Sequence, residues 1–219
     1  GTTGIAKGAM LSHGNIITNV LQARWVAEPF IGDSGKQRIA VLALPLYHIF
    51  ALTVNCLLFI ELGITAVLIT NPRDIEGFVK ELKKYRFNAI TGVNTLYNAL
   101  LNNENFKEVD FSALKLSVAG GMAIHQSVAT RWHELTGCRI IEGYGMTECS
   151  PLIAACSINV EKHNGTIGSP IPNTDIKIMQ ENGTEAPIGE PGELWVKGEQ
   201  VMQGYWNRPE ETAKTIDAR

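Results

Sequence analysis

The sequence predicts an α/β domain, in which helices flank a parallel sheet, followed by part of a small antiparallel β subdomain. Up to residue 157, short apolar runs of strand length alternate with segments whose apolar residues recur at helical spacing. This alternation is typical of parallel strands joined by right-handed crossover helices. From residue 158 to residue 219, strand-like pieces lie between Asn-Gly, Pro and Gly turns, which is the pattern of antiparallel hairpins. We therefore expect two subdomains that meet at residues 157–158.

The elements of the first subdomain follow from caps and apolar spacing. Ser12 and Asn15 can cap a helix over residues 15–27. Residues 38–44 form a continuous apolar run closed by Pro45, as expected of a strand buried on both faces. The same reasoning predicts helices at residues 49–62, 75–85, 96–101 and 126–135, and strands at residues 64–70, 89–93, 114–119 and 139–142.

The second subdomain is expected to be part of a small β-barrel or sheet. Its charged residues, such as Lys177 and Glu193, suit solvent-facing strand positions. The strand-like pieces are at residues 165–170, 175–179, 181–184 and 192–198.

The bulk composition excludes several classes of protein. With 219 residues, 45% of them hydrophobic, the chain can bury a substantial core, and its net charge of −3 gives no reason to expect a nucleic-acid partner. The longest apolar run, residues 49–60, is shorter than the roughly 20 residues of a membrane span, and no signal peptide opens the chain. Four cysteines without CxxC spacing argue against a zinc site and suggest reduced core residues of a cytosolic protein: Cys56, Cys138, Cys149 and Cys156.

The first candidate site is Glu-Gly-Tyr-Gly-Met-Thr-Glu at residues 142–148, which we interpret as a turn after an apolar strand. Its two glycines let the backbone approach a ligand, and Tyr144 between them offers a flat face to a base. Thr147 can donate to a phosphate oxygen, and Glu148 is an oxygen ligand of the kind that Mg²⁺ prefers. Taken alone, the same residues also suit a buried aromatic and a helix-start carboxylate.

The second candidate site is Gly-Thr-Thr-Gly-Ile-Ala-Lys-Gly at residues 1–8. Small residues, hydroxyls and one lysine suit a loop that wraps phosphate oxygens. It is not a Walker A loop, because the order of Lys7 and Gly8 is reversed and the spacing differs. A chain that starts on such a loop has no strand before it to hold the loop, so we expect a fragment of a longer protein.

Two further groups of residues follow strand ends. His48 comes after the first expected strand, on the side of an open α/β sheet where ligands bind. Gly120, Gly121 and Met122 end a later strand and leave room for a close ligand. A lone histidine is more often a hydrogen-bonded structural residue, and a simple strand-to-helix turn explains the two glycines nearly as well, so both interpretations stay open.

Residues 1–8 and 142–148 together resemble the phosphate loop and adenine motif of the adenylate-forming superfamily of acyl-CoA synthetases, luciferases and peptide-synthetase adenylation domains. Further blocks resemble that superfamily in the same order at residues 45–50, 192–198 and 204–212. Similarity to bacterial long-chain fatty-acid–CoA ligases is strongest at residues 44–63, 71–75 and 91–96.

The resemblance implies a two-step ligase that uses ATP, Mg²⁺ and coenzyme A. A fatty carboxylate attacks the α-phosphorus of ATP to give acyl-adenylate, and the thiol of coenzyme A then displaces AMP. The protein would contribute positioning and charge stabilisation. We expect small-molecule substrates and a cytoplasmic location, while peripheral contact with the inner membrane face and a homodimer stay open.

Roles are carried over motif by motif. The phosphate loop would hold the β- and γ-phosphates, and Thr147 would bind the α-phosphate. Thr2 and Glu148 would place the metal. The implied catalytic residues are Lys7, His48, Thr147 and Glu148. The implied nucleotide-binding residues are Gly1, Thr2, Thr3, Gly4, Lys7, Gly8, Gly120, Gly121, Met122, Gly143, Tyr144, Gly145 and Thr147.

Two positions depart from the superfamily pattern. Ala6 stands where proline is usual, and Leu52 stands where some relatives carry an aromatic gate, so the sequence gives no support for gating. By resemblance, the ribose-binding aspartate, the hinge and the C-terminal catalytic lysine lie beyond Arg219, so we expect the isolated chain to have no ligase activity.

Two alternatives remain. One is a non-catalytic module that binds an acyl chain or nucleotide, which the intact Lys7, Thr147 and Glu148 argue against. The other is an adenylation domain for an aryl or amino acid. Residues 42–62 show no clear aspartate to grip an amino group.

Overall fold

The computed structural model describes residues 6–31, 37–156 and 165–217. The helices found there are α1 (His13–Ile31), the π-helix η1 (Ala51–Leu58), α2 (Phe59–Glu61), α3 (Ile75–Leu82), α4 (Asn94–Leu101), η2 (Glu104–Glu108), α5 (Gln126–Thr136), η3 (Thr147–Cys149) and α6 (Pro209–Thr215). The strands are β1 (Ile39–Leu42), β2 (Thr65–Leu68), β3 (Ala89–Gly92), β4 (Leu116–Ala119), β5 (Ile140–Gly145), β6 (Leu152–Ala155), β7 (Ser169–Pro170), β8 (Thr174–Met179) and β9 (Glu193–Gly198).

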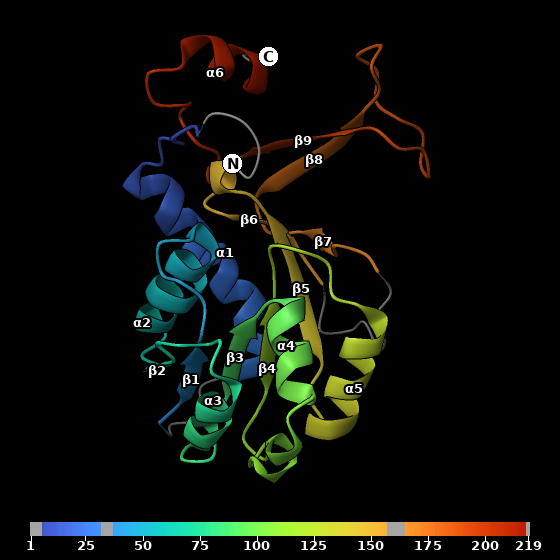
Figure 1. Cartoon of the computed structure of the whole chain (residues 1–219). Helices are drawn as coiled ribbons and strands as arrows, with labels where there is room; N and C mark the ends of the chain where they lie inside the picture. The colour runs from blue at the N-terminus through green and yellow to red at the C-terminus, as the bar shows by residue number, and fades with distance from the viewer. Residues whose placement is uncertain (1–5, 32–36, 157–164, 218–219) are drawn as a thin grey trace.

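Within these residues, seven strands form one sheet in the order β2-β1-β3-β4-β5-β6-β7. The strands from β2 to β5 are parallel, which confirms the predicted α/β class. β6 and β7 run antiparallel at the far edge, so the sheet is mixed. β8 and β9 pair as a separate antiparallel hairpin that projects beyond the end of the sheet (Figure 1).

Each face of the large sheet carries its own core, because successive strand residues point to opposite faces. Ile90 of β3 packs among residues of α3, α4 and α5, around the fully buried Trp132 and Tyr97. The neighbouring Ala89 packs on the opposite face, under α1, η1 and α2. Figure 1 shows these two helical layers enclosing the parallel strands. The double burial explains why β1 and β3 read as continuous apolar runs.

Most expected elements are confirmed, with boundaries that shift by a few residues. The first helix is longer than predicted, since α1 includes Pro29. The expected helix at 49–62 is helical through α2, but its centre winds as the π-helix η1. The expected strand piece at 181–184 is wrong, because those residues form the turn beyond β8, in which Gly183 N–H donates to Gln180 O.

The interpretation of residues 142–148 as a turn after a strand is wrong in its first half. β5 continues to Gly145 because β6 returns beside it in antiparallel pairing, with Gly143 opposite Ala155. A Cβ at Gly145 would lie 2.0 Å from the carbonyl oxygen of Pro151, so the close approach of these two strands requires glycine. Only Thr147 and Glu148 lie in the turn that follows, η3.

The predicted division at residues 157–158 stays a prediction. β7, which lies beyond that point, pairs with β6 in the large sheet, and β8 follows it closely. All four cysteines are free thiols; Cys138 and Cys149 are buried, while Cys56 and Cys156 are half-buried. Among the described helices, none combines the length and apolar character needed to cross a membrane.

Candidate active site

Glu148 of η3 meets Tyr205, which lies in the loop between β9 and α6. The Tyr205 hydroxyl donates to Oε1 of Glu148 at 2.6 Å. The backbone of the same glutamate is also held, because Met202 N–H donates to its carbonyl oxygen at 2.7 Å. Burial, together with the hydrogen bond to Glu148, raises the pKa of Tyr205 to about 12. The hydroxyl is therefore a proton donor to the carboxylate at neutral pH.

Lys7 reaches the same tyrosine from the opposite end of the chain. Its Nζ lies 4.6 Å from the centroid of the Tyr205 ring, within the range of a cation–π contact. The same Nζ lies 3.5 Å from Oε2 of Glu211 in α6. Lys214 and Lys7 hold the pKa of Glu211 below its usual range. The ammonium group is thus placed between an aromatic face and a partly exposed carboxylate.

The backbone around Lys7 is fixed by the segment that carries Tyr205. Ala9 pairs with Tyr205 in an isolated antiparallel bridge, and Trp206 N–H donates to Gly8 O at 2.8 Å. Met10 N–H donates to the carbonyl oxygen of Gly204 at 2.8 Å. The structure therefore brings Lys7 of the first predicted motif and Glu148 of the second to the same tyrosine. Tyr205, which was not among the predicted site residues, touches both.

The glycines after β4 lie against the adenine motif. Ala119 at the end of β4 is in register with Glu142 of β5. A Cβ at Gly120 would lie 3.5 Å from the carbonyl oxygen of Gly143, and Gly121 has a φ of +81° that favours glycine. Oε2 of Glu142 accepts from Ile124 N–H at 3.1 Å and so fixes the loop. These contacts place the loop that contains the exposed Met122 against Glu142 and Gly143 of β5.

His48 lies after β1, at the carboxyl end of the parallel strands. Its Nδ1 accepts from Phe50 N–H at 3.2 Å, and the side chain is exposed. A Cβ at Gly120 would lie 3.3 Å from the ring of Phe50, which places the His48 loop beside the glycine loop. The local hydrogen bond fits the structural interpretation of this histidine, while its exposure at this edge fits the catalytic one.

The two remaining residues of the adenine motif are accessible. Tyr144 is half-buried and Thr147 is exposed. Within the part of the chain that the structure describes, the Thr147 hydroxyl has no hydrogen-bond partner. A free hydroxyl at the start of a turn is compatible with the predicted phosphate contact. Four predicted residues lie outside the described residues: Gly1, Thr2, Thr3 and Gly4.

Glu148 fits a magnesium ion that takes most of its ligands from phosphate and water. The described residues contain no group of three or more His, Cys, Asp or Glu that could hold a metal alone. Mg²⁺ in nucleotide sites, however, commonly takes one or two carboxylates plus phosphate oxygens. In Glu148, Tyr205 engages Oε1, and no hydrogen bond to Oε2 is found from any described residue.

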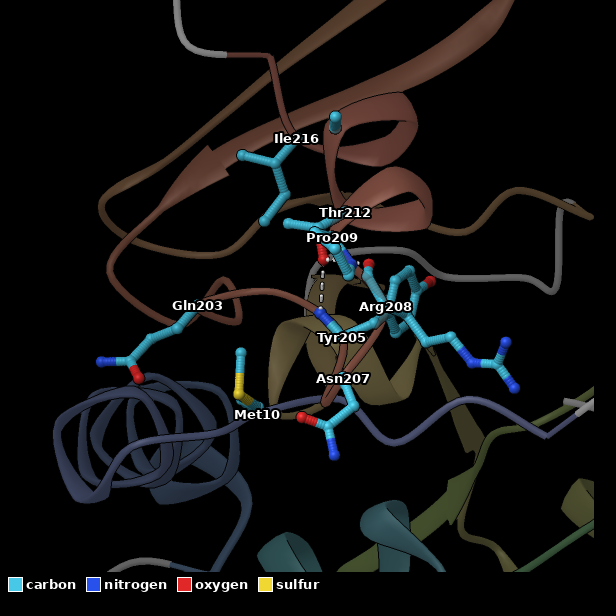
Figure 2. Close-up of a pocket in the computed structure, with 9 residues that line it drawn as sticks. Met10, Gln203, Tyr205, Asn207, Arg208, Pro209, Thr212 and Ile216 are labelled. Carbon is cyan, nitrogen blue, oxygen red and sulfur yellow. Dashed lines mark hydrogen bonds between the residues drawn. The ribbon is translucent and has the colours of Figure 1, made fainter.

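An open pocket of about 450 Å³ lies beside this cluster (Figure 2). Thr212 shapes it, since Oγ1 accepts from Tyr205 N–H at 2.9 Å and donates to Arg208 O at 2.9 Å. The pocket could not be predicted from the sequence pattern, because its walls come from segments that are far apart in the chain. They are Met10, Gln203, Tyr205, Asn207, Arg208, Pro209, Thr212, Ala213 and Ile216.

Comparison with known proteins gives a consistent result. The family described as AMP-binding enzyme matches residues 1–206. The long-chain-fatty-acid–CoA ligase of Haemophilus influenzae is 82% identical over 216 residues, and that of Escherichia coli O157:H7 is 56% identical over 216 residues. Each alignment covers 99% of this chain and 38% of the relative, so the chain spans well under half of their length.

A solved structure extends the comparison to the fold. ATP-bound MatB from Rhodopseudomonas palustris superposes with a TM-score of 0.82 at 28% identity, covering all of this chain and 42% of that protein. The match to the family thus spans the loop that carries Lys7, the turn that carries Glu148, and Tyr205, which joins them. The chain belongs to the AMP-binding enzyme family.

Proposed function

We propose that this chain is part of a long-chain fatty-acid–CoA ligase, which activates a fatty carboxylate as acyl-AMP and transfers it to coenzyme A. The observation that carries the proposal is the convergence of Lys7 and Glu148 on Tyr205. The Lys7 ammonium group, together with a carboxylate oxygen to which none of the described residues donates, suits a site for nucleotide phosphates and their metal. The identity to ligases named for long-chain fatty acids supports the choice of substrate.

In the proposed first step, the fatty carboxylate is itself the nucleophile. Lys7 would stabilise charge on the phosphates, and Thr147, whose hydroxyl bonds to none of the described residues, would donate to the α-phosphate. Glu148 would hold Mg²⁺, which supplies charge neutralisation on the phosphate oxygens when bound. The adenine base would lie beside Tyr144, against the closely packed backbone of Gly120 and Gly143.

His48 and coenzyme A would take part in the reaction from outside the site formed by Lys7 and Glu148. His48 would lie near the reacting carboxylate, because its loop abuts the glycine loop. Coenzyme A would enter in the second step, as the thiol that displaces AMP. We also propose a cytoplasmic location; peripheral membrane contact and a homodimer stay open predictions.

The test is a grafted enzyme in which this chain replaces the 216 matching residues of the Haemophilus influenzae ligase. We expect palmitate-dependent pyrophosphate exchange and palmitoyl-CoA formation. Lys7→Ala and Glu148→Ala should each lower the rate by roughly 10²- to 10³-fold, the cost of one preorganised electrostatic group. The control variant is Lys80→Ala, which removes an exposed lysine of α3 outside the site and should change the rate less than twofold.

Three outcomes would contradict the proposal. Exchange driven by aryl or amino acids but not by palmitate would favour an adenylation domain of another specificity. A grafted enzyme that binds ATP without exchange would favour a non-catalytic module. Near-normal adenylate formation by Lys7→Ala would refute the assigned role of that lysine. We further expect no thioester from the isolated 219-residue chain, which a contaminant-free preparation can check by mass spectrometry.

A further inference from the structure

The buried residues Tyr205 and Tyr97 differ in the group that accepts the hydrogen bond from their hydroxyl. Tyr205 is 6% exposed as a whole residue, so its hydroxyl needs a partner inside the protein. The other deeply buried tyrosine, Tyr97, meets that need with backbone carbonyls and donates to Val118 O at 2.8 Å. Tyr205 instead donates to the carboxylate of Glu148 at 2.6 Å. A hydrogen bond to a carboxylate is short and strong, and it orients the carboxylate as well as the phenol.

The contact restricts Glu148 at two points. Met202, which is 4% exposed, holds the carbonyl oxygen of Glu148, and Tyr205 holds Oε1 of its side chain. Both partners belong to one short segment, residues 202–205. A glutamate fixed at both ends has little rotamer freedom left to lose when its second oxygen takes a ligand.

We propose that Tyr205 is a positioning residue for metal binding: its hydroxyl fixes Oε1 of Glu148 and leaves Oε2 set to take a divalent cation. This inference rests on the proposed function in that Glu148 is the metal ligand there. Hydrogen-bond partners of metal ligands commonly contribute about 10- to 100-fold to metal affinity or activity. The ring of Tyr205 also contacts the ammonium group of Lys7. One residue therefore holds both Lys7 and the proposed metal ligand Glu148 in place.

The first test uses the 219-residue chain itself and needs no catalysis. Mn²⁺ replaces Mg²⁺ as a paramagnetic probe and is added together with ATP, whose phosphate oxygens supply the ligands that Glu148 alone cannot. Broadening of the backbone amide signals of Thr147 and Cys149 reports its binding. Tyr205→Phe keeps the ring and removes only the hydroxyl. We expect the Mn²⁺ concentration that gives half-maximal broadening to rise about 10-fold in Tyr205→Phe. Glu148→Gln should abolish the broadening at these two amides.

Tyr85→Phe is the matched control. Tyr85 lies near another glutamate, Glu81, whose pKa is lowered chiefly by the hydrogen bond from Lys84 and to a smaller extent by Tyr85; this pair lies on α3 and the turn after it, apart from Glu148. Its removal should leave the broadening profile unchanged. Amide spectra of all variants must overlay away from the site, so that a loss of fold is recognised. If Tyr205→Phe matches the wild type, or if Mn²⁺ does not broaden the wild-type amides, the inference is wrong.

The second test uses the grafted enzyme and separates positioning from a merely structural role. We expect Tyr205→Phe to raise the Mg²⁺ concentration for half-maximal pyrophosphate exchange about 10-fold, with the maximal rate recovered at saturating Mg²⁺. A structural role would instead lower the rate at every Mg²⁺ concentration. An active enzyme with unchanged Mg²⁺ dependence would refute the inference but not the function. Mn²⁺ broadening in the chain with an inactive graft would refute the function alone.

Discussion

The substitution Asn19→Ala should lower the free energy of unfolding by more than the loss of one small side chain suggests. Asn19 on α1 is fully buried, and its amide binds the backbone of β6 twice. Nδ2 donates to Leu152 O and Oδ1 accepts from Leu152 N–H, both at 2.9 Å. Nδ2 also donates to Oε1 of Gln22 at 2.9 Å. This amide is therefore a direct tie between α1 and the strand that follows the adenine motif.

The magnitude follows from the groups left without partners. Each hydrogen bond contributes about 1 kcal/mol net, and a buried group left unpaired costs about 1 to 3 kcal/mol. Loss of the amide of Asn19 strips partners from both backbone groups of Leu152 and one oxygen of Gln22. We expect the free energy of unfolding to fall by about 3 kcal/mol, a large share of the roughly 5 to 15 kcal/mol typical of a domain.

Urea denaturation followed by Trp fluorescence measures the effect in the 219-residue chain. The control is Asn98→Ala on α4, where the lost contact is a 3.4 Å hydrogen bond from the exposed Arg131. That control should stay within about 0.5 kcal/mol of the wild type. If Asn19→Ala costs less than about 1 kcal/mol, water or a shifted side chain satisfies Leu152, and the reasoning from unpaired groups fails.

Two further predictions concern packing and reactivity. Gly145→Ala should destabilise the chain by about 1 to 3 kcal/mol, because its Cβ meets the carbonyl oxygen of Pro151, whereas Gly14→Ala in α1 should stabilise it by about 0.5 to 1 kcal/mol. Thermal melts of both variants test this, and an unchanged melting temperature in Gly145→Ala would contradict the clash. Burial raises the pKa of the Cys138 thiol, so iodoacetamide should modify it more slowly than the half-buried Cys56. Peptide mass spectrometry reports both rates, and equal rates in the folded chain would show that Cys138 is reached by solvent.

The fold was predictable where local pattern and burial agree. Strands buried on both faces, such as β1 and β3, appear in the sequence as uninterrupted apolar runs. Helices that begin after a capping residue, such as α3 after Asp74, have a first residue that can be predicted from the sequence. β6 was missed because residues 152–155 alone do not show whether the chain pairs back on β5. That pairing depends on Gly145 admitting the Pro151 carbonyl, which is a contact between strands rather than a local preference.

The motifs of the site were predictable, but the residue that joins them was not. Lys7, Thr147 and Glu148 stand in stretches whose residue types match phosphate and metal chemistry. Tyr205 stands in a block that resembles the superfamily, yet a tyrosine there has many equally plausible uses in a core. Its role depends on a hydrogen bond across 57 residues and on a bridge to Ala9, which no periodicity in the sequence encodes.

The geometry also explains why the two motifs should act as one unit rather than as independent sites. Tyr205 is fixed by Thr212 through its backbone and by Ala9 through the bridge, so neither Lys7 nor Glu148 can move far without disturbing the support of the other. Residues that share one support show non-additive effects when both are changed. The segment that follows β9 is therefore part of the catalytic apparatus in the proposed ligase, although none of the residues proposed to contact the reacting atoms lies in it.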